Sequence, residues 1–137
     1  MPVAVHLLLI REGKILLLRR FNTGYEDGNY SIVAGHSDGN EDVKSAMIRE
    51  AREEAGIEIK PNHIQFASVM HRKLEDERID FFFAADSWDG EIINMEPQKC
   101  DDLSWFDIDN LPYNIIPYIK RAIENYINDV KFDVYGW

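Results

Sequence analysis

The sequence is poor in cysteine, in basic residues and in long apolar runs, and each shortage excludes a class of protein. Cys100 is the single cysteine among 137 residues, so an internal disulfide and a cysteine zinc cluster are both excluded. The apolar start, Met1 to Ile10, is only about ten residues long, which is too short to cross a bilayer. It also lacks the basic start and the small-residue cleavage site of a signal peptide. Together these features predict a cytoplasmic protein.

Positive charge is scarce, and the acidic excess is local. The chain has 15 Lys and Arg against 25 Asp and Glu, a formal net charge of −10. Residues 35–57 hold six acids and three bases, residues 86–109 hold eight acids and one base, and the rest of the chain is balanced. Such a protein is poorly suited to bind a nucleic-acid polymer or an anionic membrane through charge. An anionic ligand would need a cation between it and the protein.

The length predicts one domain over residues 1–137. Branched and aromatic runs predict strands at 3–10, 15–20, 30–33, 64–71, 79–85 and 103–108, with loops at 21–29 and 35–40. Helices are predicted at 41–55, which Gly56 follows, and at 117–128, which begins with Pro117. Strands on both sides of a central helix indicate a mixed α/β layered domain. We expect the aromatic tail at 135–137 to pack on its own domain.

The central predicted helix carries glutamates where apolar side chains belong. At about 100° per residue, its apolar side chains share one stripe, made by Val43, Ala46, Met47 and Ala51. Glu50 and Glu54 fall in the middle of that stripe, and Glu53 falls at its edge. A solvated, charged helix surface is the ordinary interpretation of a Glu-rich helix. Two carboxylates on a core-facing stripe, however, are costly to desolvate without partners and repel each other at this spacing.

A divalent cation would remove both problems, since Mg²⁺ and Mn²⁺ prefer carboxylate oxygens. Glu50, Glu53 and Glu54 lie along one side of about a single helical turn, so they can share an ion or a pair of ions. Arg49 precedes Glu53 by four residues and can hold it through a charge-assisted hydrogen bond. The helix therefore predicts a site for Mg²⁺ or Mn²⁺.

The segment from Gly35 to Ile57 resembles the Nudix box, G-x5-E-x7-R-E-U-x-E-E-x-G-U, in which U is apolar. Eight or nine constrained positions at fixed spacing make this motif specific. Every fixed position matches, with Ala51 as the small apolar residue: Gly35, Glu41, Arg49, Glu50, Ala51, Glu53, Glu54, Gly56 and Ile57. One departure lies at its start, where Ala34-Gly35-His36 replaces the common Pro-Gly-Gly.

The resemblance implies a Nudix fold, with a mixed β-sheet sandwiched between α-helices, and a metal-dependent hydrolase of nucleoside diphosphate linkages. The catalytic set it implies comprises Glu41, Arg49, Glu50, Glu53 and Glu54. Glu50, Glu53 and Glu54 would be the metal ligands, with Glu50 also a candidate general base and the carbonyl of Gly35 facing the same site. Arg49 would orient the carboxylates, and Glu41 would support them electrostatically. Bound cations would neutralise the diphosphate and lower the pKa of an attacking water.

Residues outside the box complete the predicted site. Glu96 lies in the acidic 86–109 segment, where the resemblance implies a further metal ligand, against the alternative of a solvated loop glutamate. Arg20 corresponds to a phosphate-binding arginine of members that cleave nucleoside triphosphates, against a plain surface charge. His36 is predicted to contact phosphate or act as an acid, or to be a solvated loop histidine. Asn114 resembles an asparagine that reads guanine in the sanitising members. His6, within an apolar strand, is better explained as a satisfied structural histidine.

The resulting hypothesis is a Nudix pyrophosphohydrolase that converts a small nucleotide, first of all a nucleoside triphosphate, to its monophosphate and pyrophosphate. A nucleoside diphosphate sugar or ADP-ribose hydrolase is the alternative within the enzyme class. A non-catalytic Nudix domain that senses a nucleotide is the alternative from another class, although such domains generally lose box carboxylates that this chain keeps. The resemblance also allows a homodimer, since Nudix hydrolases are often dimers.

Overall fold

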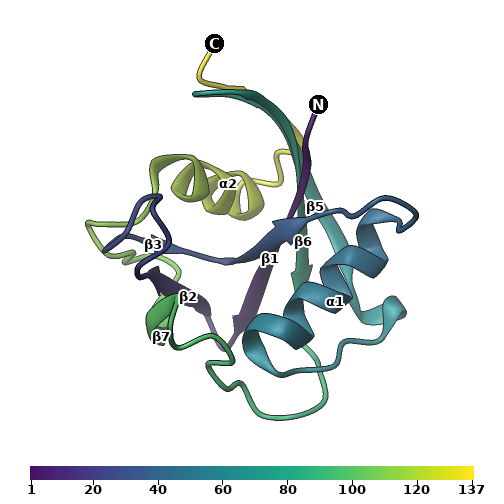
Figure 1. Cartoon of the computed structure of the whole chain (residues 1–137), viewed down its shortest axis with the longest axis vertical. Helices are drawn as coiled ribbons and strands as arrows, with labels where there is room; N and C mark the ends of the chain where they lie inside the picture. The colour runs from purple at the N-terminus through teal and green to yellow at the C-terminus, as the bar shows by residue number, and fades with distance from the viewer.

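A computed structural model describes all 137 residues as one eight-stranded mixed sheet with a helix on each face (Figure 1). The main path through the sheet is β3-β2-β1-β6-β5-β8, with β4 also paired to β1 and β7 to β2. The strands are β1 (Val3–Arg11), β2 (Lys14–Arg20), β3 (Tyr30–Ser31), β4 (Val33–His36), β5 (Gln65–Lys73), β6 (Glu77–Ala85), β7 (Cys100–Asp107) and β8 (Phe132–Tyr135). The helices are α1 (Val43–Ala55), α2 (Pro117–Ile127) and the short 3₁₀ turn η1 (Pro61–His63).

Two hydrophobic cores, one on each face of the sheet, hold the layers together. Successive residues of a strand point to opposite faces, and β1 divides its side chains accordingly. Val5, Leu7 and Leu9 pack with α1, whereas Leu8 packs with α2. The predicted arrangement of a mixed sheet between helices is therefore confirmed. Neither α1 nor α2 has the length and apolar composition that a bilayer-spanning helix requires.

Helix α1 has a defined start and end that its sequence encodes. The side chain of Asp42 accepts a hydrogen bond from the backbone N–H of Ser45 at 2.9 Å, which satisfies one of the unpaired donors of the first turn. At the other end Gly56 adopts a left-handed conformation, with φ of 69°, as the C-terminal position of a helix commonly requires. The helix begins two residues later than predicted because Asp42 is its cap rather than its first turn.

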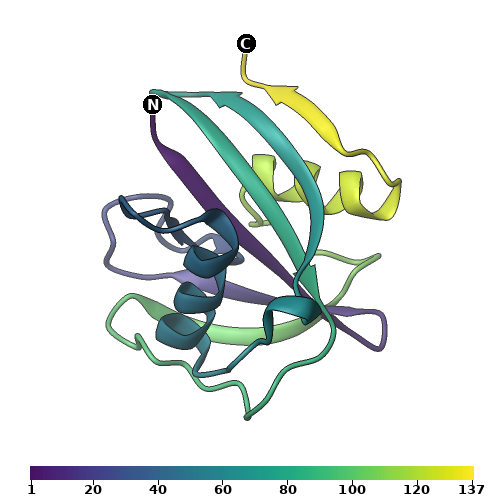
Figure 2. The same ribbon diagram turned by 90° about the vertical axis from the view of Figure 1, so that its right-hand side faces the viewer.

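Strand pairing changes several predicted boundaries. The expected strand 30–33 is two strands, and β4 continues through Gly35 and His36, which we predicted as loop, because it pairs with β1 over Ala4 to Leu7. Strands β5 and β6 extend into the charged stretch 72–78 and form one long hairpin (Figure 2). β7 begins at Cys100 rather than Leu103.

The C-terminal segment forms β8, a strand that we did not predict, which runs parallel to β5 at the edge of the sheet. Beyond it, the Trp137 indole N–H donates to the backbone carbonyl of His71 at 3.0 Å. Its ring lies 4.6 Å from the His71 ring, between centroids. The expectation that the aromatic tail packs on its own domain is thus confirmed.

Candidate active site

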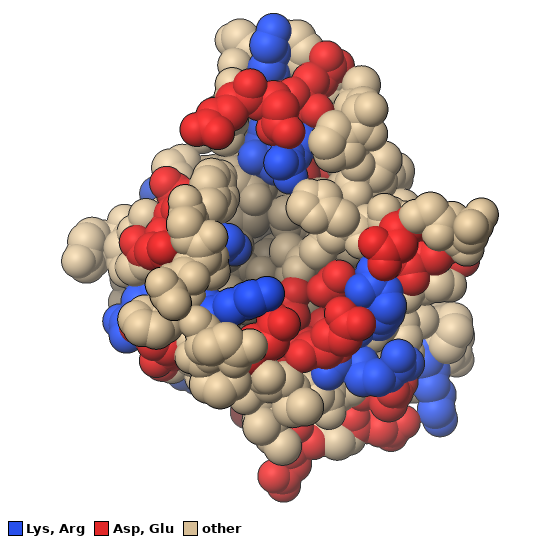
Figure 3. Space-filling model, in the orientation of Figure 1, with Lys and Arg blue, Asp and Glu red and all other residues tan.

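A cleft of about 630 Å³ opens at the surface of the molecule. Its walls include β4, the loop after β2, the β5–β6 hairpin and α2. The space-filling view shows this hollow near the middle of the face, with acidic atoms along one side and basic atoms at other parts of its rim (Figure 3). Its acidic side includes Glu54 and Glu96, and its basic side chains are Arg20, Arg72, Arg78 and Lys99. Acidic residues also lie on the hairpin side, where Glu75 and Asp76 line the cleft and Asp76 pairs with Arg78.

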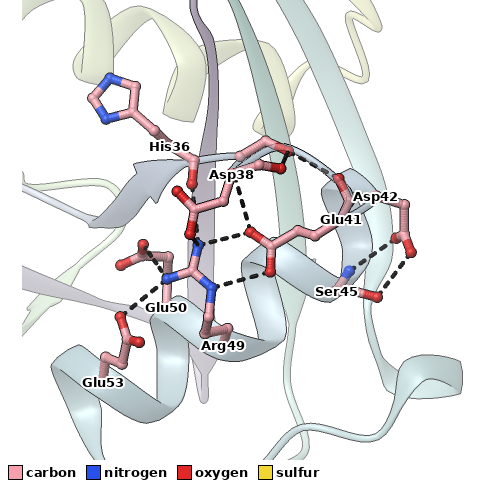
Figure 4. Close-up of polar contacts among 9 residues, drawn as sticks. His36, Asp38, Glu41, Asp42, Ser45, Arg49, Glu50 and Glu53 are labelled. Atoms are coloured by element: carbon pink, nitrogen blue, oxygen red, sulfur yellow. Dashed lines mark hydrogen bonds and ion pairs between the residues drawn. The ribbon is translucent and has the colours of Figure 1, made fainter.

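Arg49 is the centre of the carboxylate cluster on α1 (Figure 4). Its guanidinium donates to both oxygens of Glu41, at 2.8 and 3.1 Å, and to Glu50 at 2.9 Å. It also donates to Glu53 at 3.1 Å and to the backbone carbonyl of His36 at 3.1 Å. Hydrogen bonds from Arg49 lower the pKa of Glu41 and keep that carboxylate ionised. One arginine therefore connects three box glutamates to the end of β4.

Glu50 packs directly against the backbone of β4, and this contact explains why Gly35 is a glycine. A Cβ atom placed on Gly35 would lie 2.1 Å from the Glu50 carboxyl carbon, far inside van der Waals contact. The φ of Gly35 is not in the left-handed region, so the constraint is space rather than backbone conformation. The backbone of Gly35 and the Glu50 carboxylate thus lie side by side, as the resemblance implied.

Glu54 is the most deeply placed of the carboxylates. Burial, followed by the neighbouring carboxyl of Glu50, raises the pKa of Glu54 well above its usual range. The backbone N–H of Ala34 donates to it at 3.3 Å, and the charge of Glu96 adds to the repulsion. The exposed fraction of the side chain is 13% for Glu50 and 52% for Glu53. Glu50 and Glu54 therefore face inward and Glu53 lies at the edge, as predicted.

The loop after β6 is attached to the end of α1, and this attachment brings Glu96 to the cleft. The backbone N–H groups of Ile93 and Met95 donate to the carbonyls of Ala55 and Glu54, at 3.0 and 3.2 Å. The Asn94 side chain accepts from the N–H of Glu96 at 3.0 Å. Glu96 is half-buried and lines the cleft beside Glu54, so a residue 41 positions after the last residue of α1 joins the same acidic wall.

The donor set fits a hard divalent cation. Glu54 is desolvated, repelled by Glu50 and Glu96, and helped by a single backbone N–H, which is the imbalance that Mg²⁺ or Mn²⁺ would relieve. Glu50 and Glu53 face Arg49, and no three acidic, histidine or cysteine side chains form a ready metal cage. The Arg49 guanidinium thus supplies the positive charge that faces these two carboxylates.

Arg20 and His36, for which the sequence predicts phosphate contacts, both line the cleft. Arg20 donates to the backbone carbonyl of Tyr25 at 2.6 Å and to the Thr23 hydroxyl at 3.0 Å, so the loop after β2 fixes its direction. The Nε2 of His36 lies 3.0 Å from the Arg78 guanidinium, and that arginine also pairs with Asp76. Both residues belong to the basic part of the rim.

Asn114, in contrast, is not among the residues that line the cleft. The side-chain amide of Asn114 donates to the backbone carbonyl of Gly28 at 2.8 Å. The backbone carbonyl of Asn114 accepts from the backbone N–H of Tyr30 at 2.9 Å. Both bonds connect the segment before α2 to the chain around β3. The structure therefore uses Asn114 to hold two loops together, and the predicted role in reading a base is not supported by its placement.

The sequence analysis did not identify a buried polar network on the opposite wall of the cleft. Asp80, fully buried on β6, accepts from Arg72 at 2.6 and 3.2 Å and lies 3.0 Å from His6 Nε2. His6 is only partly satisfied, because its Nδ1 is enclosed without a partner. The sequence offered one sign of this network, an aspartate between two apolar residues in Ile79-Asp80-Phe81. A carboxylate buried in a strand requires a partner.

Comparisons with known proteins agree with this site. The family model described as NUDIX domain matches residues 1–126. The NAD-capped RNA hydrolase NudC of Pseudomonas putida KT2440 is 33% identical over 125 residues, which cover 90% of this chain and 41% of that protein. The protein of the same name from Stutzerimonas stutzeri A1501 is 34% identical over 106 residues, or 77% and 37%. This chain thus spans about two fifths of the length of these curated relatives.

Solved structures show the same architecture. The MutT NUDIX hydrolase of Burkholderia pseudomallei superimposes with a TM-score of 0.83 at 27% identity, over 90% of this chain and 95% of that one. The MutT protein of Methanosarcina mazei Go1 gives 0.80 at 21% identity, over 93% and 94%. With a family match over nearly the whole sequence and the complete box assembled at a cleft, this chain belongs to the Nudix hydrolase family.

Proposed function

We propose that this chain is a Mg²⁺- or Mn²⁺-dependent pyrophosphohydrolase that cleaves a nucleoside triphosphate to the monophosphate and pyrophosphate. The observation that carries the proposal is the cluster on α1, where Arg49 holds three glutamates beside the half-buried, desolvated Glu54 and the cleft. The cleft volume, about 630 Å³, is within the range of sites for one small ligand. The single reduced cysteine and the composition fit a cytoplasmic enzyme.

Each residue of the cluster has a role in this proposal. When bound, the divalent cation supplies charge neutralisation for the diphosphate and a water of lowered pKa. Glu50, Glu53 and Glu54, with Glu96 and the carbonyl of Gly35, would hold it. Arg49 fixes the direction of Glu50 and Glu53 through hydrogen bonds of 2.9 and 3.1 Å. Glu50, held against β4, would accept the proton of the attacking water.

The charged rim would position the phosphates for an in-line displacement. Arg20 lines the cleft with its guanidinium oriented by Thr23 and Tyr25, and Lys99 and His36 lie on the same rim. A guanidinium held in a fixed plane is suited to phosphate oxygens. Proper alignment of the two phosphates with the attacking water contributes most of the rate in such reactions.

A dinucleotide diphosphate is the second candidate substrate class, because relatives of 33–34% identity are named NAD-capped RNA hydrolases. That name also opposes our expectation that no nucleic-acid polymer is a partner. The nucleoside diphosphate sugar and ADP-ribose alternatives share the same diphosphate chemistry. A nucleotide sensor without catalysis is disfavoured because all four box glutamates are retained. We also propose that the protein forms the homodimer that the resemblance implies.

A substrate panel tests the proposal. We expect wild-type protein with Mg²⁺ or Mn²⁺ to release pyrophosphate from nucleoside triphosphates, and to act less well on NAD, a 5′-NAD-capped RNA and ADP-ribose. Glu54→Gln and Glu53→Gln should each lower kcat/KM about 100-fold, since each removes a ligand charge from the cluster. Glu124→Gln, the same change on the exposed face of α2, serves as the matched control.

Calorimetric titration with Mn²⁺ measures metal binding directly and, together with the substrate panel, distinguishes the possible outcomes. We expect Glu53→Gln and Glu54→Gln to bind Mn²⁺ more weakly than wild-type protein, and Glu124→Gln to bind it with wild-type affinity. Full turnover by both cluster variants would make the metal assignment wrong. Faster turnover of NAD or capped RNA than of every triphosphate would move the substrate to the second class. Tight nucleotide binding without any turnover would favour the sensor.

A further inference from the structure

The wall of the cleft opposite the carboxylates carries a polar group that the proposed chemistry does not use. Arg72 and Asp80 are buried, with exposed side-chain fractions of 7% and 0%. Arg72 nevertheless lines the cleft, together with His6 and Tyr118. A buried ion pair at the wall of a binding cleft is an expensive arrangement to keep for stability alone, so its geometry toward the cleft is informative.

Asp80 uses only one edge of the Arg72 guanidinium. The Nε and Nη2 groups donate to the two carboxylate oxygens, at 2.6 and 3.2 Å. The Nη1 group makes no hydrogen bond within the protein, and it is not enclosed, since His6 Nδ1 is the sole fully buried side-chain polar atom without a partner. The second edge of the guanidinium, formed by Nη1 and the remaining N–H of Nη2, is therefore free to donate to a ligand.

The free edge is held in a fixed orientation. The Arg72 guanidinium carbon lies 3.8 Å from the centroid of the Tyr118 ring, which fixes the plane of the guanidinium. Asp80 fixes its rotation in that plane and is itself held by His6. Such an edge recognises two neighbouring acceptor atoms in one plane, because its two N–H groups are parallel.

The strand order places this edge at the far end of the substrate. Gly35, beside Glu50, lies on β4, and the sheet runs from β4 through β1 and β6 to Arg72 on β5. Three strand spacings of about 4.8 Å separate the two backbones by about 14 Å. The Arg72 side chain reaches back to Asp80 on β6, which leaves about two strand spacings, roughly 10 Å, between its guanidinium and the Gly35 backbone. One phosphate group does not span that distance. A nucleotide whose phosphates meet the carboxylates would therefore bring its base toward Arg72.

We propose that the free edge of Arg72, oriented by Asp80 and Tyr118, reads the O6 and N7 acceptors of a guanine base. The proposal rests on the proposed hydrolysis of nucleotides. Guanine presents this acceptor pair, to which arginine binds through two hydrogen bonds, whereas adenine presents N7 beside an amino donor. A donor facing the Arg72 edge would be repelled and left unpaired. Arg72 is thus a specificity residue rather than a catalytic one.

The same edge discriminates against oxidised guanine. In 8-oxoguanine N7 carries a proton, so one acceptor of the pair becomes a donor. The substrate class inferred from Arg72 is therefore the undamaged 6-oxopurine nucleotide, and inosine triphosphate, which keeps O6 and N7, should be accepted equally. Cytosine also has two adjacent acceptors, O2 and N3, but its single ring is shorter and would reach less far toward β5.

A substrate with one atom changed tests the contact without any mutation. We expect wild-type protein to hydrolyse GTP and ITP with similar kcat/KM, and 7-deaza-GTP, which lacks the N7 acceptor, about tenfold less well. The kcat/KM for ATP should be roughly five- to 100-fold below that for GTP, and the kcat/KM for 8-oxo-dGTP should be below that for dGTP by the same factor. In Arg72→Lys, which keeps the positive charge beside Asp80 but has no second edge, the ratio of GTP to 7-deaza-GTP should fall to about one.

Two controls keep the outcome clear. Arg121→Lys, on the outer face of α2 with Asp133, should leave the wild-type ratio of GTP to 7-deaza-GTP unchanged. Because the readout is a ratio between two substrates, a partial loss of folded Arg72→Lys does not alter it. Equal kcat/KM for GTP and 7-deaza-GTP in the wild type, or a preference for CTP, ATP or 8-oxo-dGTP over GTP, would overturn the assignment of Arg72.

Binding of the product separates this inference from the proposed function. Calorimetry with GMP and 7-deaza-GMP measures base reading without turnover. Base-indifferent hydrolysis would leave the proposed function intact and remove the role of Arg72. No hydrolysis of any nucleotide, together with tighter binding of GMP than of 7-deaza-GMP, would remove the hydrolase proposal and keep the base-reading edge. Absence of both nucleotide hydrolysis and GMP binding would overturn both.

Discussion

Two charged networks face each other across the cleft, and their imbalances are opposite. Around α1 one guanidinium, that of Arg49, is shared among four carboxylates, those of Asp38, Glu41, Glu50 and Glu53, so negative charge is left over. On β6 one carboxylate, Asp80, is shared between Arg72 and His6, so hydrogen-bond donors are left over. The first network suits a cation and the second suits acceptor atoms. A nucleotide carrying a divalent ion at its phosphates and acceptors on its base matches both.

The networks also differ in burial, and this difference predicts where stability depends on charge. Arg49 has a side-chain exposure of 24%, against 7% for Arg72 and 0% for Asp80. Solvent screens pairs of the first kind, so they contribute little to folding. Removal of one partner from a buried pair leaves an uncompensated charge, which is strongly destabilising.

The largest effect should come from Asp80→Ala, which leaves the Arg72 guanidinium buried without its partner. We expect the free energy of unfolding, measured by urea denaturation, to fall by about 3–5 kcal/mol. The matched control is Asp76→Ala, which breaks the pair between Arg78 and a carboxylate that is 52% exposed, and its effect on the free energy of unfolding should be much smaller because solvent screens the pair. Equal losses in the two variants would show that the buried network does not stabilise the fold.

A change at Gly35 should separate activity from stability in the α1 network. In Gly35→Ala the new methyl group would meet the Glu50 carboxylate, whose carbon lies 2.1 Å from the Cβ position. The clash involves only the far end of the Glu50 side chain, which can shift at the cost of its hydrogen bond with Arg49, so we expect a small loss of stability. Its displacement should nevertheless lower kcat about 100-fold, as a shift of about 1 Å in a catalytic group can do.

Gly39→Ala is the control for that change, because a Cβ on Gly39 meets nothing within 4 Å. Steady-state kinetics and thermal unfolding of both variants complete the comparison. If Gly35→Ala keeps wild-type turnover, the close approach of β4 to Glu50 has no catalytic value.

The two networks differ again in what the sequence alone could predict. The α1 network lies within 23 consecutive residues, so helical periodicity was enough to place Glu50 and Glu54 inward and Glu53 at the edge. Glu96 could be assigned to the same site only through the family resemblance. Its position depends on hydrogen bonds between the loop after β6 and the end of α1, and no local pattern encodes those bonds.

The β6 network could not be predicted in this way, because its members come from three strands. His6, Arg72 and Asp80 are separated by up to 74 residues, and they meet only when β1, β6 and β5 are aligned in register. The contacts of Asn114 could not be predicted either, for a related reason. Its spacing resembled a base-reading position, but its amide is used by Gly28, a contact that depends on how two loops pack.

The smallest of the expected effects is the pH dependence that Asp80 confers on stability. Burial opposes its ionisation, but the hydrogen bonds from His6 and Arg72 outweigh burial and lower the pKa of Asp80 from 3.8 to about 2. A carboxyl whose pKa is depressed on folding contributes stability that is complete above the unfolded pKa and is lost as the pH falls through the folded one.

Between about pH 4 and pH 2 the ionised Asp80 should therefore lose about 2 kcal/mol of stabilisation. Urea unfolding across that range should show a steeper fall for the wild type than for Asp80→Asn, whose amide does not titrate. Asp76 has a pKa lowered by its hydrogen bond with Arg78, yet its exposure to solvent weakens the coupling, so Asp76→Asn should keep most of the wild-type slope. Parallel curves for the wild type and Asp80→Asn would mean that the exposed carboxylates, rather than the buried one, govern acid unfolding. The two networks would then differ only in their roles at the cleft.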